Sequence, residues 1–280
     1  MLARLGQMLA LLLLAAGCFA HREAPPRLER STSAADAAAR RETVQFLDLS
    51  GRPDDPLPDG LDRFPRLTRL SLRSQRRSEV PAPVLAAGGL TWLDVSDNPL
   101  SVLPDALGGL PRLECLYASD STLASLPPAI GRLPALRYLN LDRNALTNLP
   151  PEMGGLTGLR WLRLSGNALT NLPPELAGLG NLQALYLRAN RLETVPACLG
   201  RMAALQDLLL ADNRIAAVPD WVAQLPKLRT LDLCRNPLSR LPPGIGQCRS
   251  LRILLLTGCP IDAAERARIR TALPACHVSF

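Results

Sequence analysis

The sequence predicts a solenoid, an elongated protein built from similar coils that stack on one another. The first observation is a gapless 23-residue repeat, with nine full units over residues 44–250 and a partial tenth unit from Leu251. The second is that the same places in each unit stay apolar. The third is energetic, because burying about seven apolar side chains per unit is worth about 10–20 kcal/mol. Ordering each of the 23 residues of a unit costs about 1.5 kcal/mol, and the summed cost exceeds the gain from burial. A unit therefore cannot fold alone, and stacked neighbours must share one core.

Each unit is expected to begin with a short strand. In one unit, Leu139 and Leu141 are two residues apart, so they lie on the same face of a strand. Tyr138, Asn140 and Asp142 then point to the opposite face. Apolar residues later in the unit turn inward from the rest of the coil.

The fixed residues form the pattern LxxLxLxxNxL, followed by a Leu-Pro pair, as in "LRYLNLDRNALTNLPPEMGGLTG". This pattern resembles the leucine-rich repeat family over residues 44–261. The period and the "LPPEL" segment are similar to the plant intracellular Ras-group-related subgroup, whose features many bacterial members share. The resemblance implies an α/β fold: a right-handed leucine-rich repeat solenoid, with a parallel sheet on its concave face and short helical or irregular segments on its convex face.

The ninth position of the unit is asparagine in six units. The resemblance implies that this side chain turns inward and that its amide bonds the backbone of adjacent coils, since a tight turn leaves backbone groups in need of partners. A plain turn preference of asparagine is the alternative, but six residues in register favour the ladder. Ser121 can form fewer hydrogen bonds, so an irregularity is expected over residues 118–123. The ladder residues are Asn98, Asn144, Asn167, Asn190, Asn213 and Asn236.

The first residues have the features of a bacterial lipoprotein signal. A basic residue precedes an uncharged stretch that ends in "AAGC". This order resembles a lipobox, which implies that residues 1–17 are a signal peptide and that Cys18 is acylated. An ordinary secretory signal cut after Ala20 is the alternative. Phe19 stands where aspartate would retain a lipoprotein at the inner membrane, so an outer-membrane destination is allowed.

Segments at both ends are expected to cap the repeats, as solenoids require. Residues 18–43 begin as a polar tether and favour a short helix over 33–42, with a serine N-cap. Residues 262–280 favour a second helix, which begins at a capping box of Asp262 and Glu265, and then a final strand.

The seven cysteines do not suggest a disulfide framework. Cys248 takes a core position, whereas Cys115 and Cys234 take positions on the outer strand faces. Cys259 and Cys276 point inward on the last two coils, so this pair is the one placed for a disulfide. Exposed unpaired thiols fit an oxidising compartment poorly, which argues against export.

Several kinds of chemistry are missing from the sequence. The two histidines, His21 and His277, belong to no Ser-His-Asp or Cys-His pattern. No cysteine or histidine spacing is typical of zinc, and no Walker loop is present. The net charge is +7, but basic and acidic residues are interspersed, without a basic run that includes aromatic residues. We therefore predict no enzyme activity, no metal, no cofactor and no nucleic-acid partner.

The variable positions of the strands carry most of the large aromatic residues of the chain. All three tyrosines and two of the three tryptophans fall on the outer strand face, with arginines beside them. Aromatic residues suit strands in any case and pack across neighbours. Grouped Tyr, Trp and Arg are, however, typical of protein-binding hot spots. The predicted ligand-binding residues of the concave face are Trp92, Tyr117, Tyr138, Trp161, Arg163, Tyr186 and Arg188.

These observations favour a non-enzymatic recognition protein that is lipid-anchored in a bacterial envelope. Its ligand is expected to be a protein, or a glycan that stacks on Trp92, Tyr138 and Trp161. One alternative is a cytoplasmic scaffold in signalling, whose N-terminus is not a signal. Another is a purely structural spacer of the envelope.

Overall fold

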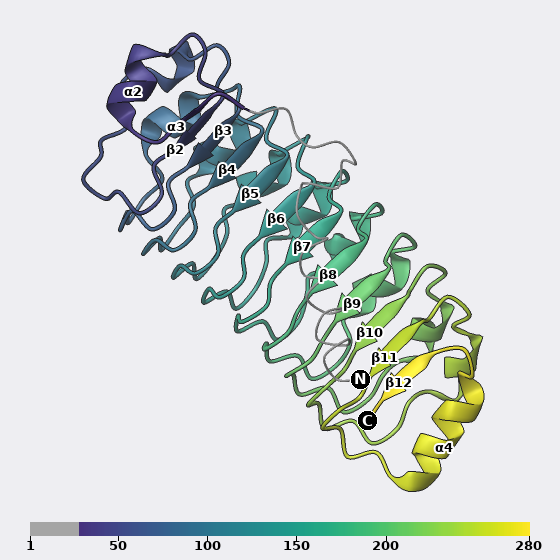
Figure 1. Ribbon diagram of the computed structural model, residues 1–280. Helices are drawn as coiled ribbons and strands as arrows, with labels where there is room; N and C mark the ends of the chain where they lie inside the picture. The colour runs from purple at the N-terminus through teal and green to yellow at the C-terminus, as the bar shows by residue number, and fades with distance from the viewer. Residues whose placement is uncertain (1–27) are drawn as a thin grey trace.

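The computed structural model describes residues 28–280, which form one stack of coils (Figure 1). Twelve strands of this part of the chain lie in one sheet, in sequence order, and each pairs with its neighbours in parallel. The predicted α/β solenoid with a parallel sheet is confirmed. The strands are β1 (Arg30–Ser31), β2 (Phe46–Asp48), β3 (Arg69–Ser71), β4 (Trp92–Asp94), β5 (Cys115–Tyr117), β6 (Tyr138–Asn140), β7 (Trp161–Arg163), β8 (Ala184–Tyr186), β9 (Asp207–Leu209), β10 (Thr230–Asp232), β11 (Ile253–Leu255) and β12 (His277–Ser279).

The strands of the repeats pair with a constant offset of one repeat. Tyr138 faces Trp161 and Leu139 faces Leu162 across β6 and β7. Because side chains alternate along a strand, this register stacks leucine on leucine inside and variable residue on variable residue outside. The inner leucines belong to one continuous buried core that runs from the first coil to the last.

The segments opposite the sheet are short helices, mostly of the 3₁₀ type. Most begin directly after a proline in extended conformation, such as Pro150 before η4. The fixed φ of proline suits this place at the start of a helix. Their backbones stack closely: a Cβ on Gly131 would lie 2.0 Å from the Glu152 carbonyl oxygen, so glycine alone fits there. The helices are η1 (Leu61–Arg63), α3 (Ala82–Ala86), η2 (Asp105–Gly109), η3 (Pro128–Arg132), η4 (Pro151–Gly155), η5 (Pro174–Gly178), η6 (Ala197–Arg201), η7 (Asp220–Gln224) and η8 (Pro243–Gln247).

The ninth-position asparagines bridge consecutive coils. Asn167 Nδ2 donates to the Leu141 carbonyl of the previous coil and to the Leu164 carbonyl of its own coil, each at 3.0 Å. Its Oδ1 accepts the Leu146 N–H at 3.1 Å. The other five asparagines of the ladder make the same set of bonds, so every amide satisfies backbone groups that the tight turn leaves without partners.

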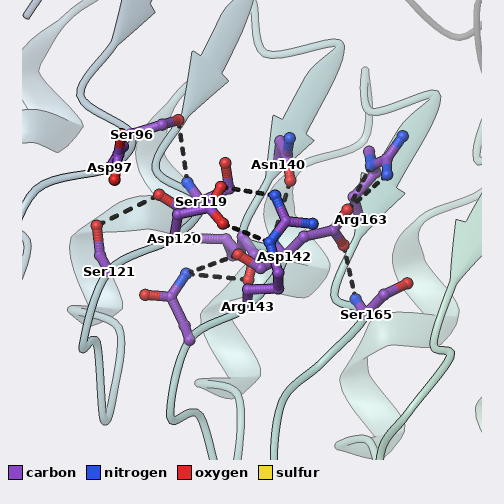
Figure 2. A network of polar contacts seen from close by, with 12 residues as sticks. Ser96, Asp97, Ser119, Asp120, Ser121, Asn140, Asp142, Arg143, Arg163 and Ser165 are labelled. Atoms are coloured by element: carbon purple, nitrogen blue, oxygen red, sulfur yellow. Dashed lines mark hydrogen bonds and ion pairs between the residues drawn. The ribbon is translucent and has the colours of Figure 1, made fainter. Parts of the chain in front are cut away.

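Two residues replace asparagine near the ends of the ladder. Gln75 Nε2 donates to the Leu49 carbonyl at 2.9 Å, and the Cys259 thiol donates to the Leu233 carbonyl at 3.1 Å. Ser121 does not bridge in this way. Its hydroxyl donates at 3.4 Å to a carbonyl of its own coil, and Figure 2 shows this bond at one side of the polar network. The irregularity expected over residues 118–123 is therefore the absence of one inter-coil side-chain bridge from the ladder.

The eighth position of each repeat adopts a left-handed backbone conformation. Its φ lies between 52° and 80° in all ten repeats, although glycine occupies it in just three of them. This conformation sharpens the turn after the strand, and the asparagine that follows can then point inward. Non-glycine residues such as Ala189 bear a conformational cost there.

The two ends differ in part from the sequence-based expectation. Helix α2 (Ala34–Ala39) begins after the predicted cap Ser33, whose hydroxyl accepts the Asp36 N–H, but it ends before residue 42. Ahead of this helix, Arg30–Ser31 pairs with β2 as β1, and the guanidinium carbon of Arg30 lies 5.3 Å from the Phe46 ring centroid.

The C-terminal cap consists of helix α4 (Ala263–Ala272) and β12. Asp262 accepts the Glu265 N–H at 2.8 Å, as predicted for an N-cap. Glu265 does not complete the capping box: its carboxylate accepts the Leu241 N–H at 2.9 Å and pairs with Arg268, so it joins the cap to the last coils instead.

The proposed disulfide between Cys259 and Cys276 is not formed, and both thiols are free. The Cys259 thiol points to the Leu233 carbonyl as the last rung of the ladder. Cys276 lies half-buried in the cap, where its thiol faces the carbonyl of His277. The ladder therefore directs the Cys259 thiol toward the preceding coil.

Asn167→Ala is expected to destabilise the protein by about 1–3 kcal/mol, since it leaves buried backbone groups of two coils without partners. Asn148 is the control, because it is also an asparagine but lies exposed, two residues before the proline that precedes η4. Thermal or urea unfolding of both variants measures the difference. Equal stability of the two would show that the ladder does not hold the coils together.

Ser121→Asn is expected to stabilise the protein by about 1 kcal/mol, because it supplies the missing rung. The Leu100 N–H, which now donates to the Asn98 carbonyl of its own turn, would gain the amide acceptor that matching residues of other coils have. Ser121→Ala, which adds no acceptor, is the control. An unfolding midpoint for Ser121→Asn at or below that of Ser121→Ala would contradict this expectation.

Candidate binding site on the concave face

The N-terminal half of the outer sheet face carries a strip of packed aromatic rings. Successive ring centroids are 5.8 Å apart from Phe46 to Trp92, 5.4 Å from Trp92 to Tyr117 and 4.8 Å from Tyr117 to Tyr138. Trp161 follows Tyr138 on the next strand. The pairs are edge-to-face or tilted, as aromatic contacts prefer. The register of the repeats therefore turns separate sequence positions into one aromatic strip, defined here as these five residues.

The strip is less exposed than the sequence suggests. Tyr138 is 3 % exposed and Tyr186 is 6 % exposed, so neither side chain projects freely although both stand at outer strand positions. Trp92, Tyr117 and Trp161 are half-buried. Burial raises the pKa of the Tyr117, Tyr138 and Tyr186 hydroxyls, which therefore stay neutral at physiological pH.

An ion pair lies beside the strip, on β7 and the turn that follows β6. Arg163 Nη2 lies 2.6 Å from Asp142 Oδ2, and the Asp142 side chain is 2 % exposed. Asp142 Oδ1 also accepts the Ser165 N–H at 2.7 Å. Figure 2 shows Asp142 held between the two coils by these bonds. The arginine is fixed further by Tyr186, whose ring centroid lies 5.0 Å from the guanidinium carbon.

A pocket of about 230 Å³ opens on the same face toward the C-terminal end of the sheet. Three of the predicted ligand residues line it: Arg163, Tyr186 and Arg188. The aromatic residues of the strip do not belong to its lining. The predicted site thus divides into two neighbouring parts, the strip over β2–β7 and the pocket beyond it.

The pocket also contains residues that the sequence-based prediction missed. They stand at outer strand positions like the predicted residues, but they are acidic, aliphatic or small. One sequence signal could have identified them: the aromatic residues of the outer strand face stop before β9–β11, where acidic, aliphatic and small residues take the same positions. They are Asp207, Leu209, Thr230, Asp232 and Leu255.

Three thiols of the described residues, those of Cys198, Cys234 and Cys276, are poor nucleophiles. Burial raises the pKa of Cys198 and Cys276 to about 11 and that of Cys234 to about 12. Little thiolate therefore exists at neutral pH, and oxidation or covalent catalysis at these positions is disfavoured. Residues 28–280 contain no group of three His, Cys, Asp or Glu side chains placed to hold a metal ion.

A membrane-spanning helix needs a minimum length and a high hydropathy. None of the helices within residues 28–280 is long and apolar enough to cross a bilayer. The predicted signal segment 1–17 and Cys18 lie outside the described residues.

Family models match the repeats in three places. A leucine-rich repeat region model covers residues 127–214, and two leucine-rich repeat models cover residues 204–261 and 89–110. The chain is a leucine-rich repeat protein. A search of curated proteins gives no match to it.

Solved leucine-rich repeat structures resemble the chain in fold. The leucine-rich repeat domain of the type III effector XopL is 26 % identical, with a TM-score of 0.66, and the match covers 77 % of each chain. The ectodomain of the receptor kinase GASSHO1/SCHENGEN3 from Arabidopsis thaliana, in complex with CASPARIAN STRIP INTEGRITY FACTOR 2, is 26 % identical, with a TM-score of 0.52 over 72 % of this chain and 31 % of the receptor.

A second plant receptor shows the fold alone. The peptide hormone receptor RGFR1, in complex with RGF2, is 23 % identical, with a TM-score of 0.57 over 77 % of this chain and 44 % of the receptor. The leucine-rich repeat protein described here thus spans less than half the length of either plant receptor structure.

Proposed function

We propose that this leucine-rich repeat protein is a non-enzymatic recognition module that binds a protein or peptide ligand on its concave face. The observation that carries the proposal is the aromatic strip with the adjoining pocket. A solenoid needs its inner leucines and its ladder to fold, but it does not need five large aromatic residues grouped on the outer sheet face, four of them with their rings in contact. Such rings, next to fixed arginines, are typical of binding hot spots.

The comparisons support a binding role in general terms. The GASSHO1/SCHENGEN3 ectodomain, which shares the fold and 26 % of aligned residues, was solved with a bound partner. The fixed pairing of Arg163 with Asp142 and Tyr186 adds to this support. A side chain that is held before the ligand arrives loses less conformational entropy on binding.

We further propose that the module is lipid-anchored in a bacterial envelope through Cys18, on the "LLLLAAGC" segment of the sequence. Exposed thiols fit an oxidising compartment poorly, which is the objection to export. The raised thiol pKa values of Cys198, Cys234 and Cys276 weaken that objection, because thiols that stay protonated oxidise slowly. Phe19 stands where aspartate would retain a lipoprotein at the inner membrane, so the proposal allows an outer-membrane location.

Trp161→Ala is expected to weaken capture of the natural partner about thirtyfold, which corresponds to a hot-spot loss of about 2 kcal/mol. Trp161 is the better choice than Tyr138, whose burial makes it part of the packing of the sheet. Immobilised wild type and variant are incubated with envelope extract, and bound proteins are quantified by mass spectrometry.

Trp221→Ala is the matched control for Trp161→Ala. Trp221 is also a half-buried tryptophan, but it lies in η7 on the opposite side of the coil. The proposed function requires proteins that are lost with Trp161→Ala and kept with Trp221→Ala. If the Trp161 variant captures the same proteins as wild type, recognition does not use this face.

Labelled palmitate is expected to appear on the wild-type protein in bacterial cells and to be absent from Cys18→Ser, because the thiol is the acylated group in a lipobox. Gel fluorography after cell fractionation measures both the label and the location. Equal labelling of the two forms, or an unlabelled wild type, would rule out the lipid anchor and leave the recognition role to be judged by the capture experiment.

A further inference from the structure

Two carboxylates that line the concave-face pocket have no ion-pair partner within residues 28–280. Neighbouring acidic residues do: Asp120 pairs with Arg143, Asp142 with Arg163 and Asp212 with Arg235. None of the ion pairs of the described residues includes Asp207 or Asp232. The pocket therefore has an acidic end whose charge the rest of this part of the chain leaves unpaired.

Asp232 is the more unusual of the two carboxylates. It is 4 % exposed and lines the pocket; its carboxylate accepts the Cys234 N–H at 3.0 Å and interacts with the Cys234 side chain, and neither group is a cation. A buried carboxylate without a cation is costly unless a partner is supplied. Burial also raises the pKa of Asp207, and its contacts with Thr230 and Arg229 offset only part of this effect.

The walls around the carboxylates suit a long side chain with a charged end. Leu209, Leu255 and the ring of Tyr186 provide apolar surface beside Asp207 and Asp232. Arginine and lysine bury their aliphatic stems along such surface while the charged end finds its partner. The volume of about 230 Å³ lies below the range of about 300–1,000 Å³ usual for sites that enclose a whole small molecule, so it fits one inserted side chain.

The position of the carboxylates favours arginine. Asp207 stands on β9 opposite Thr230, and Asp232 stands on β10 opposite Leu209. The two acids thus come from neighbouring strands and approach a ligand from different points. A planar guanidinium has five N–H donors in a fixed fork and can serve two carboxylates at once, whereas an ammonium acts as a point charge.

We propose that this pocket is the specificity pocket of the concave face and binds an arginine side chain of the partner. The proposal rests on the proposed function, since it assigns a chemical class to the ligand of that same face. The guanidinium contacts Asp207 and Asp232, and its stem packs on Leu209 and Leu255. Arg143, Arg163 and Arg188 also line the pocket, but each is paired with an aspartate, so the unpaired charge of the pocket lies at Asp207 and Asp232.

The test uses the full chain and N-acetyl-arginine N-methylamide as the probe. Leucine methyl NMR of the labelled protein reports binding at Leu209 and Leu255. The neutral analogue N-acetyl-citrulline N-methylamide has nearly the same shape without the charge. Saturable shifts of both methyl groups with the arginine amide, and at least tenfold weaker binding of the citrulline amide, are expected.

Three variants separate the pocket from general charge effects. Asp232→Asn and Asp207→Asn are each expected to weaken probe binding about tenfold or more. Asp48→Asn is the control, because Asp48 lies on the same sheet at β2, is paired with Arg30, and neither residue lines the pocket. Unfolding curves of all three variants check that each is folded.

Several results would overturn the proposal. They are the absence of shifts at Leu209 and Leu255 with millimolar arginine amide, equal binding of the citrulline amide, or equal weakening by Asp48→Asn. Failure of the proposed function has a different signature, because Trp161→Ala would then capture partners normally whatever the probe does. If probe binding fails while Trp161→Ala still loses its partner, the face binds ligands but does not select arginine through this pocket.

Discussion

The bond between the ninth-position amide and the previous coil is the constraint on which the molecule depends. Each ladder asparagine joins three backbone groups, and at least one belongs to the coil before it. This fixes the distance and the rotation from one coil to the next, so the strands must pair one repeat apart. The leucine core follows from that register, and so does the stacking of outer residues. A coil without its neighbour would lose both its hydrogen-bond partners and most of its burial.

The same register gives the outer face its chemistry. Residues one repeat apart are brought to about 4.8 Å, the spacing of neighbouring strands. A substitution at one variable position therefore changes the contacts of the residues beside it on both adjacent strands. Residues of adjacent coils that are 21 residues apart become diagonal neighbours, and in this way Tyr117 and Tyr138 form a ring contact and Asp142 and Arg163 form an ion pair. Asp207 and Asp232 stand in the same lattice of positions, but their neighbours on the sheet are Thr230 and Leu209. Their charges stay unpaired because the sequence places no arginine at those neighbouring positions.

Features set by positions that recur in every repeat could be predicted from the sequence. Features set by contacts between particular variable residues could not. The strand register, the inward asparagines and the gap at Ser121 all follow from positions that recur every 23 residues. The left-handed eighth position also recurs, but Arg143 and Ala189 occupy it as well as Gly166, so residue type gave no signal. The burial of Tyr138 depends on packing with its neighbours, which no single position reveals. Nothing in the sequence distinguishes Asp207 and Asp232 from acids on a sheet face that are solvated.

The geometry of the face limits the size of any ligand that uses both of its parts. Trp92 lies on β4 and Asp232 on β10, six strand-to-strand steps apart in the order of the sheet. At about 4.8 Å per step, the two are separated by roughly 29 Å along the sheet. An extended peptide covers about 3.3 Å per residue, so roughly nine residues are needed to reach from one to the other. A single sugar or metabolite is too short for this. A ligand that contacts the aromatic strip and places an arginine in the pocket must therefore be an extended peptide segment or the surface of a folded protein.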